Sequence, residues 1–252
     1  MILELKKEII YGPVNSRRLG RSLGINILPP ARKVCPFNCV YCQYGWTEIH
    51  VANGDIIPEL PSINAVRRAL KKALTELPTP PTYITFSGNG EPTLHPEFDR
   101  MAEEVIALRD QLAPGAKTAI LSNSALVSDP LTRASLAKLD MRIMKLDCGS
   151  RQTFQKYNQP CPGVDIDAIT EGLVQLSDVH IQTLVATGER GNLDPENIEK
   201  WIERLKRIIP VSVQLYTLDR GYPSNQLSPA SREDLSRIQE QVQKERITID
   251  VF

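Results

Sequence analysis

The chain has 252 residues, of which 41% are hydrophobic and 24% are charged, and its thirty basic and thirty acidic side chains cancel. These fractions exclude a mostly disordered chain or a coiled coil, and zero net charge excludes an overall field that would draw the protein to nucleic acid or to a membrane. No apolar run approaches the ~18 residues of a membrane helix, and acidic residues stand where a signal peptide would be apolar. We therefore predict a cytoplasmic protein without a membrane segment.

The first part of the chain is basic. Residues 1–34 hold seven basic and two acidic side chains, so the net charge of this stretch is +5. No repeat, low-complexity tract or linker divides the remainder. We predict one domain over residues 23–252, with a C-terminal extension, preceded by a basic lead-in segment over residues 1–22. Three arginines here, Arg17, Arg18 and Arg21, could clamp a phosphate or carboxylate, or could pair with acidic residues across the fold.

Six short segments rich in β-branched or large apolar residues are predicted to be strands. They span residues 23–28, 83–86, 118–121, 142–146, 180–185 and 211–216. Between them, apolar residues recur at spacings of three and four, which is typical of amphipathic helices. Asp129-Pro130, Asp194-Pro195 and Ser231 provide signals for helix starts. The alternation of strands and helices predicts an α/β fold with a parallel sheet.

Polar side chains alternate with apolar ones along the predicted strands and fall on one face of the sheet. They are Asn26, Thr85, Ser87, Lys145, Asp147, Gln182, Ser212 and Gln214. A closed eight-stranded barrel would fill its interior with branched apolar side chains. The polar face therefore favours a partial (β/α)6 barrel of the TIM type, incompletely closed, with a large polar ligand inside. The alternative is a set of edge strands with one solvated face.

Three of the five cysteines form a cluster. Cys35, Cys39 and Cys42 lie in the loop after the first predicted strand, which is the catalytic end of a βα barrel. Thiolates favour zinc, Cu(I) or iron-sulfur clusters. A structural zinc ion needs a fourth ligand. The candidates for that ligand are Cys148, Cys161, His50 and His95. An iron-sulfur cluster held by three thiolates would instead leave one iron open to a substrate or cofactor.

Two motifs resemble those of the radical S-adenosylmethionine (SAM) superfamily. The first is Cys35-x3-Cys39-x2-Cys42, with the aromatic Tyr41 before the last cysteine. The second follows the second strand and reads Phe-Ser-Gly-Asn-Gly-Glu-Pro-Thr-Leu over residues 86–94. It resembles the Gly-Gly-Glu motif, whose backbone and acid bind the amino group of SAM. Asn89 stands where many members have glycine.

The resemblance implies one four-iron four-sulfur (4Fe-4S) cluster per chain, held by the three cysteines. SAM would bind the fourth iron, and one-electron reduction would cleave it to methionine and a 5′-deoxyadenosyl radical. The implied SAM-binding residues are Tyr41, Ser87, Gly88, Asn89, Gly90, Glu91, Ser122, Asn123 and Asp147. A cap or turn is the alternative role for Ser122 and Asn123, and a salt bridge is the alternative for Asp147.

Cys148, beside Asp147 at the expected barrel mouth, is a candidate catalytic residue. Its thiol could return a hydrogen atom to a product radical or attack the substrate, or it could be a small buried hydrophobe. Cys148 and Cys161 alone cannot ligate a second cluster, so we expect only one. The length leaves no room for a flavodoxin-like domain. The electron should therefore come from an external ferredoxin-like or flavodoxin-like donor.

Two further segments narrow the resemblance. Residues 11–26 and 216–220 resemble a little-characterised radical SAM subgroup related to the wybutosine-synthesis (4-demethylwybutosine synthase-like) enzymes, which rebuild a guanine in tRNA. This kinship and the basic lead-in favour a radical SAM oxidoreductase whose substrate is RNA or a nucleotide-like small molecule. Two alternatives stay open. One is a radical SAM maturase of peptides or proteins, and the other is a non-catalytic iron-sulfur or zinc-binding regulatory protein.

Overall fold

The computed structural model describes residues 1–54 and 57–252. Its main sheet contains the strands β1 (Ile10–Ser16), β2 (Gly20–Ile25), β5 (Tyr83–Phe86), β6 (Lys117–Ser122), β7 (Met141–Lys145), β8 (Val179–Leu184), β10 (Ser212–Tyr216) and β12 (Ile249–Val251). They are ordered β1-β2-β5-β6-β7-β8-β10-β12. Neighbours from β2 to β12 are parallel, and β1 is antiparallel to β2. The predicted α/β fold with a parallel sheet is confirmed.

Helices cover the outer side of this sheet. They are α1 (Ile63–Glu76), α2 (Phe98–Leu112), α3 (Pro130–Ala137), α4 (Arg151–Tyr157), α5 (Ile166–Val174), α6 (Pro195–Ile208) and α7 (Arg232–Lys244), with a 3-10 turn, η1, at Pro92–Leu94. Asp129, Asp194 and Ser231 each accept a backbone N–H at the start of α3, α6 and α7, as predicted. The short helix α4 was not predicted, because seven residues are too few to show a helical period.

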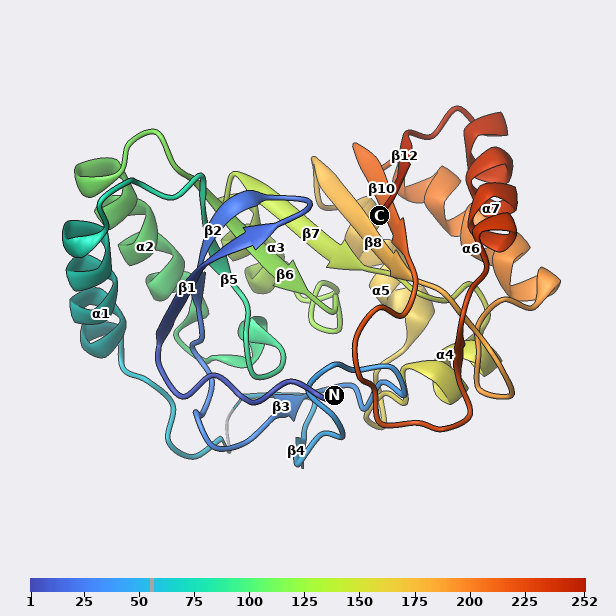
Figure 1. Cartoon of the computed structure of the whole chain (residues 1–252), viewed down its shortest axis with the longest axis horizontal. Helices are drawn as coiled ribbons and strands as arrows, with labels where there is room; N and C mark the ends of the chain where they lie inside the picture. Colours follow the sequence, from blue (N-terminus) through green and yellow to red (C-terminus); the bar gives the residue numbers. More distant parts are fainter. Residues whose placement is uncertain (55–56) are drawn as a thin grey trace.

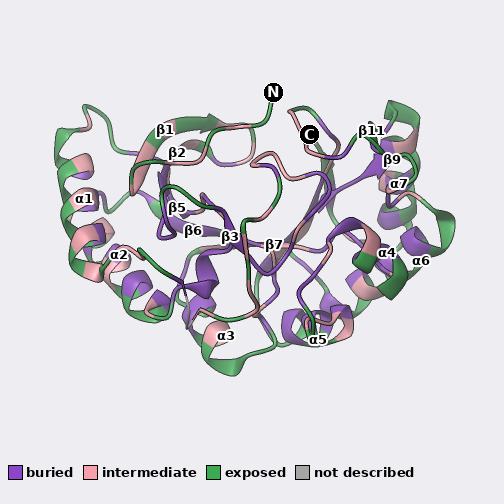
Figure 2. Ribbon diagram, turned by 90° about the horizontal axis from the view of Figure 1, so that it is seen from below, coloured by how far each residue is buried: buried purple, intermediate pink, exposed green. Residues whose placement is uncertain are grey.

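The sheet is an open arch rather than a closed barrel. Figure 2 shows the helices following the outer side of the arch and both termini on its open side. The strands β1 and β12 form the two edges. This is the predicted partial barrel in a single domain. No helix within the described ranges is long and apolar enough to cross a membrane.

Within the described residues the sheet has eight strands, whereas six were predicted. The strand β1 contains Gly12 and Pro13, residue types that are depleted in strands, and it tolerates proline because it lies at the edge. The other added strand, β12, has only three residues. The strand β2 begins at Gly20, so the predicted boundary after residue 22 falls inside it.

The inner face of the sheet is polar, as predicted, and its side chains bond across neighbouring strands. Ser22 and Thr85 share a hydrogen bond of 2.7 Å between their hydroxyl oxygens. The Gln182 amide donates to the Gln214 side-chain oxygen at 3.2 Å. The opposite face carries apolar residues such as Ile84, which is fully buried in the core. Many polar groups thus face the interior of the arch, together with the apolar Leu121, Ile143 and Leu184, while the face towards the helices is apolar.

Trp201 on α6 anchors this outer layer behind the end of β7. Its Nε1 donates to the Leu146 carbonyl at 2.9 Å, and the residue is 1% exposed. The Thr183 hydroxyl donates to the same carbonyl at 2.8 Å. The indole therefore stabilises the fold mainly by filling space, because the Leu146 carbonyl would still accept from the Thr183 hydroxyl if the indole were removed.

We expect Trp201→Ala to lower the free energy of unfolding by about 3–5 kcal/mol because it leaves a cavity. Trp201→Phe should cost only about 1–2 kcal/mol because a ring still fills the site and Thr183 still serves the carbonyl. Urea denaturation measures both losses. Val174→Ala, at an exposed position, is the control and should change the free energy of unfolding by no more than about 0.5 kcal/mol. Equal losses in Trp201→Ala and Val174→Ala would contradict the assignment.

His95, directly after η1, is buried in its neutral form. Its Nε2 lies 3.1 Å from the Pro61 carbonyl, and its Nδ1 accepts the Glu97 backbone N–H at 3.1 Å. One ring nitrogen therefore donates and the other accepts, as in an uncharged imidazole. Burial lowers the pKa of His95 below its ordinary value of 6.5.

The unfolded chain consequently takes up this proton at a higher pH than the folded chain. The free energy of unfolding should fall as the pH drops through 6.5 and then through the lower pKa of folded His95. Glutamine in the His95→Gln variant cannot take up this proton. The difference in free energy of unfolding between wild type and the variant should therefore shrink as the pH is lowered from about 7.5 to about 5, as measured by urea titrations at each pH. A constant difference would rule out the buried neutral imidazole.

Candidate functional site

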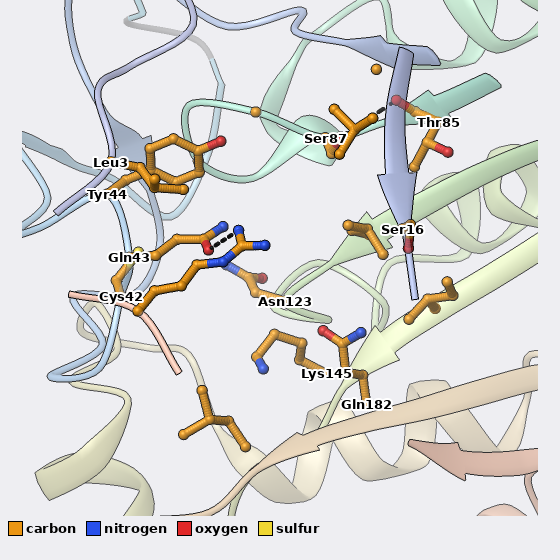
Figure 3. Close-up of a pocket in the computed structure, with 18 of the residues that line it drawn as sticks. Leu3, Ser16, Cys42, Gln43, Tyr44, Thr85, Ser87, Asn123, Lys145 and Gln182 are labelled. Atoms are coloured by element: carbon orange, nitrogen blue, oxygen red, sulfur yellow. Dashed lines mark hydrogen bonds between the residues drawn. The ribbon is translucent and has the colours of Figure 1, made fainter. Parts of the chain in front are cut away.

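One cavity of about 430 Å³ opens on the inner face of the arch. This size is within the range of small-molecule sites. Its walls come from the cysteine loop, the ends of β5, β6 and β7, the β1–β2 hairpin, and the loop after β10. Figure 3 shows Ser87 and Cys42 on two sides of this space and the neighbouring side chains of Lys145 and Gln182 on a third. Residues distant in sequence therefore converge on a single site.

The cysteine loop contacts the sheet through a two-residue strand, β3 (Val34–Cys35). The Val34 N–H donates to the Asn89 carbonyl at 2.9 Å, and the Glu91 N–H donates to the Val34 carbonyl at 3.1 Å. β3 also pairs with β4 (Ile49–His50). All three clustered cysteines are unpaired thiols that line the cavity, at positions 35, 39 and 42. The three predicted metal ligands thus line the same cavity.

Nitrogen donors and a cation surround these thiols. The Asn123 amide donates to the Cys35 sulfur at 3.2 Å, and the Asn158 amide donates to the Cys39 sulfur at 3.4 Å. The Lys33 ammonium, on a residue that is 3% exposed, donates to the Gly45 carbonyl at 2.7 Å. Burial raises the pKa of Cys39 to about 11 and that of Cys35 further.

These surroundings fit an iron-sulfur cluster. The donor set consists of soft sulfurs, which iron-sulfur clusters require. Buried thiols of raised pKa become thiolates when a metal centre supplies positive charge. Amide donors to the sulfurs are the outer contacts that tune such a centre. Among the described residues, no group of three Cys, His, Asp or Glu side chains, the three cysteines included, is arranged to hold a single metal ion.

The other proposed zinc ligands are engaged elsewhere. The His50 Nε2 lies 3.0 Å from the Pro36 carbonyl, and His95 contacts the Pro61 carbonyl. Cys161 is buried, and among the described residues it is not part of the cavity lining. None of these three side chains faces the cysteine cluster across the cavity.

The glycine-rich loop after β5 lies against the cysteine loop. Gly88 and Gly90 line the cavity with φ values of 130° and 139°, which favour glycine. A Cβ atom on Gly90 would lie 1.6 Å from the Val34 carbonyl oxygen. Ser87, at the start of this loop, shares a hydrogen bond with the Tyr11 hydroxyl. The loop therefore presents its backbone to the cavity.

Glu91 joins two of the predicted SAM-binding segments. One carboxylate oxygen accepts from the Ser122 hydroxyl at 2.9 Å and from the Thr93 hydroxyl at 2.7 Å. The other accepts from the Asn123 backbone N–H at 2.6 Å. Burial raises the pKa of Glu91, and these donors oppose the increase. Glu91 thus positions Ser122 and Asn123, and all three line the cavity.

Asn89, by contrast, points away from the cavity and holds the N-terminal segment. Its side-chain oxygen accepts from the Lys6 N–H at 2.7 Å. Its amide donates to the Lys6 and Pro29 carbonyls, at 2.9 Å in each case. The residue is fully buried. The departure from glycine at this position therefore has a structural reason, because asparagine ties residues far apart in the sequence to the loop.

Tyr41 and Asp147 form a buried pair beneath the cavity. The Tyr41 hydroxyl donates to the Asp147 carboxylate, and its ring lines the cavity. Asp147 also accepts from the Leu184 N–H at 2.9 Å and from the Asn158 amide at 2.9 Å, and it lies 3.1 Å from the Lys145 ammonium. Asp147 itself is absent from the lining formed by the described residues. The structure therefore shows the salt-bridge role.

Cys148 does not have the surroundings of a catalytic thiol. It is fully buried, it donates to the Asn158 side-chain oxygen at 3.3 Å, and within the described ranges it is not part of the cavity lining. Burial raises its pKa well above the ordinary value. Reactive cysteines are accessible and have lowered pKa values. These surroundings favour the alternative role of Cys148, that of a small buried residue.

Several lining residues were not assigned to the site from sequence. Lys6, Tyr11, Tyr44 and Gln43 come from the lead-in segment and from the end of the cysteine loop. Lys6, Gln43 and Tyr44 belong to no motif, and only their position in the fold brings them to the cavity. Tyr11 and Tyr216 lie in the two segments that carry the subgroup resemblance, which assigned them no role. Tyr216 ends β10, and a polar residue at a strand end was the one available signal.

The chain was compared with known proteins. The radical SAM superfamily model matches residues 32–189. A UPF0026 protein of Helicobacter pylori is 34% identical over 229 residues, which cover 90% of this chain and 70% of that protein. The structure of TYW1 with a lysine-pyruvate adduct bound has a TM-score of 0.62 at 17% identity, over 89% of this chain and 73% of that one.

A second structure has the same fold. Streptococcus suis SuiB bound to S-adenosylmethionine has a TM-score of 0.63 at 15% identity, over 91% of this chain and 50% of that one. At such identities the two structures show a shared fold only. The family match covers the cysteine loop, the glycine-rich loop and Asn123. On this match, which covers more than half of its residues, the chain belongs to the radical SAM superfamily of enzymes.

Proposed function

We propose that this protein is a radical SAM oxidoreductase. It would cleave SAM reductively at a 4Fe-4S cluster held by Cys35, Cys39 and Cys42, with RNA or a nucleotide-like small molecule as its substrate. The observation that carries the proposal is that the three thiols, the glycine-rich loop and the Ser122–Asn123 segment line one cavity. When bound, the cluster and SAM supply one-electron chemistry and a source of the 5′-deoxyadenosyl radical.

The chain would hold the cluster in a dry and electrostatically balanced place. Cys35 and Cys39 are buried, so their sulfurs are shielded from water. The Asn123 and Asn158 amides donate to these two sulfurs and would stabilise negative charge on them. Lys33, buried in the same loop, adds a positive charge next to the thiolates.

The neighbouring loops would orient SAM. The backbone at Gly88 and Gly90 allows close approach, and the Ser87 hydroxyl and the loop carbonyls can accept from an ammonium group. Glu91 places its negative charge behind this loop and fixes Ser122 and Asn123. The Tyr41 ring lines the cavity and offers a flat surface for adenine to stack on.

The substrate class rests on one likeness. The lead-in segment resembles that of the wybutosine-synthesis enzymes, and this resemblance supports RNA or a nucleotide-like metabolite. We further propose that the electron is delivered by an external ferredoxin-like or flavodoxin-like protein.

Anaerobic reconstitution tests the proposal. The full chain should bind about four irons and should form 5′-deoxyadenosine from SAM when a strong reductant such as dithionite is added. Replacing Cys35, Cys39 and Cys42 by alanine should remove the iron and reduce 5′-deoxyadenosine to the protein-free background. Iron is measured by a colorimetric assay and 5′-deoxyadenosine by liquid chromatography.

Cys161→Ala is the matched control, because it removes a buried thiol outside the described cavity lining. This variant should keep both the iron and the cleavage of SAM. Cleavage by the triple variant would show that the cysteine loop is not the cluster site. A protein that holds one zinc ion and leaves SAM intact would exclude the oxidoreductase.

A further inference from the structure

The three arginines of the lead-in segment have different partners in the structure. Arg17 forms an ion pair with Asp219 in the loop after β10. Arg21 donates to the Thr79 carbonyl at 2.8 Å and, among the described residues, is not part of the cavity lining. Arg18 lines the cavity. Among these three arginines, only Arg18 combines a cavity position with a charge that no carboxylate of the described residues neutralises.

Arg18 lies in the β1–β2 turn, which extends across the open side of the arch towards β8 and β10 (Figure 1). Its guanidinium carbon is 4.4 Å from the centre of the Tyr216 ring and 5.5 Å from that of Phe252. Stacking of this kind uses the flat faces of the guanidinium. The N–H groups at its edge stay free to donate.

One of these edge groups has no acceptor. The Arg18 Nη1 is shielded from solvent and has no hydrogen-bond partner within residues 1–54 and 57–252. A buried donor without an acceptor is unfavourable, and most such groups in proteins are paired. Because the donor is charged, an anionic acceptor would satisfy it best. Because the Arg18 side chain lines the cavity, a ligand that enters the cavity and displaces the contacts that shield this donor is the candidate acceptor for its guanidinium.

A second cation contacts the same aromatic ring. The Lys145 Nζ lies 3.1 Å from the Tyr216 hydroxyl and 5.3 Å from the ring centre. Lys145 is partly neutralised by Asp147 below it, at 3.1 Å. Leu121 and Ile143 also line the cavity, and both are apolar. This part of the cavity therefore combines positive charge with an apolar surface.

We infer that Arg18 binds an oxyanion of the substrate, either a carboxylate or a phosphate, and that Leu121 and Ile143 contact the carbon skeleton attached to it. Lys145 adds a second positive charge on the Tyr216 side. This inference rests on the proposed function, because it assigns a substrate class to the same cavity. It requires no covalent step at Arg18, which acts as a binding residue.

The test is isothermal titration calorimetry on the anaerobically reconstituted full chain, with inorganic phosphate, acetate and SAM as separate probes. Wild type should bind phosphate or acetate, and the anion that binds identifies the group. Arg18→Gln should lower the affinity for that anion at least about tenfold, because it removes hydrogen bonds to a charged group. Arg18→Lys keeps the positive charge but loses the paired N–H donors of the guanidinium, so it should lower the affinity less. Arg21→Gln is the matched control and should bind like wild type.

Three results would overturn the inference. The first is that neither anion binds to the wild-type protein. The second is that the Arg18→Gln variant binds the anion as tightly as wild type. The third is that this variant loses affinity for SAM by the same factor as for the anion, which would assign Arg18 to the SAM carboxylate. Thermal unfolding shows whether the variants are folded, and Arg18→Lys preserves the charge if Arg18→Gln does not fold. Formation of 5′-deoxyadenosine is measured in parallel. Anion binding without SAM cleavage by wild type would reject the proposed function and leave the anion site standing.

Discussion

The site depends on the close approach of Gly90 to Val34. Any side chain at Gly90 would collide with the Val34 carbonyl oxygen, since a Cβ would lie only 1.6 Å from it. This contact places the cysteine loop against the glycine-rich loop. Glu91 then fixes the segment after β6, and Asn123 of that segment donates back to the Cys35 sulfur. The contacts form a closed circuit, so the position of each loop is determined by the other two.

This circuit also explains how a polar interior is stable. Buried polar groups are tolerated when each has a partner. The Glu91 carboxylate accepts several hydrogen bonds, and the Asp147 carboxylate is bonded by Tyr41, Asn158 and the Leu184 N–H. The cost of burying these charges is thus offset locally. Arg18 differs from them because one of its nitrogens has no partner in the described part of the chain.

Much of the fold could be predicted from the sequence because its signals are local. The strand β5 has the predicted bounds, and the caps Asp129 and Asp194 begin helices as expected. The cysteine spacing alone located the cluster loop. Asp147 illustrates where the alternation rule fails. β7 ends at Lys145, and beyond that point the chain turns, so the alternation of the strand no longer decides where a side chain points.

Contacts between distant segments could not be predicted in this way. Asn89 bonds to Lys6, 83 positions away, and neither residue carries a local signal of this contact. The short edge strand β1, with its glycine and proline, likewise forms only because β2 offers it a partner. Such pairings follow from the assembled fold. They are therefore visible only in the structure.

The segments outside the family match complete the cavity. The match begins at residue 32 and ends at residue 189, yet Tyr11, Arg18 and Tyr216 all line the same space. Radical SAM proteins with different substrates share the fold, so the fold itself does not select a substrate. Selection must come from the walls that are added to it. In this chain the hairpin and the end of β10 supply those walls, and they meet where the Arg18 guanidinium lies 4.4 Å from the centre of the Tyr216 ring. The residue proposed to bind the substrate anion is therefore also the one that joins these two walls.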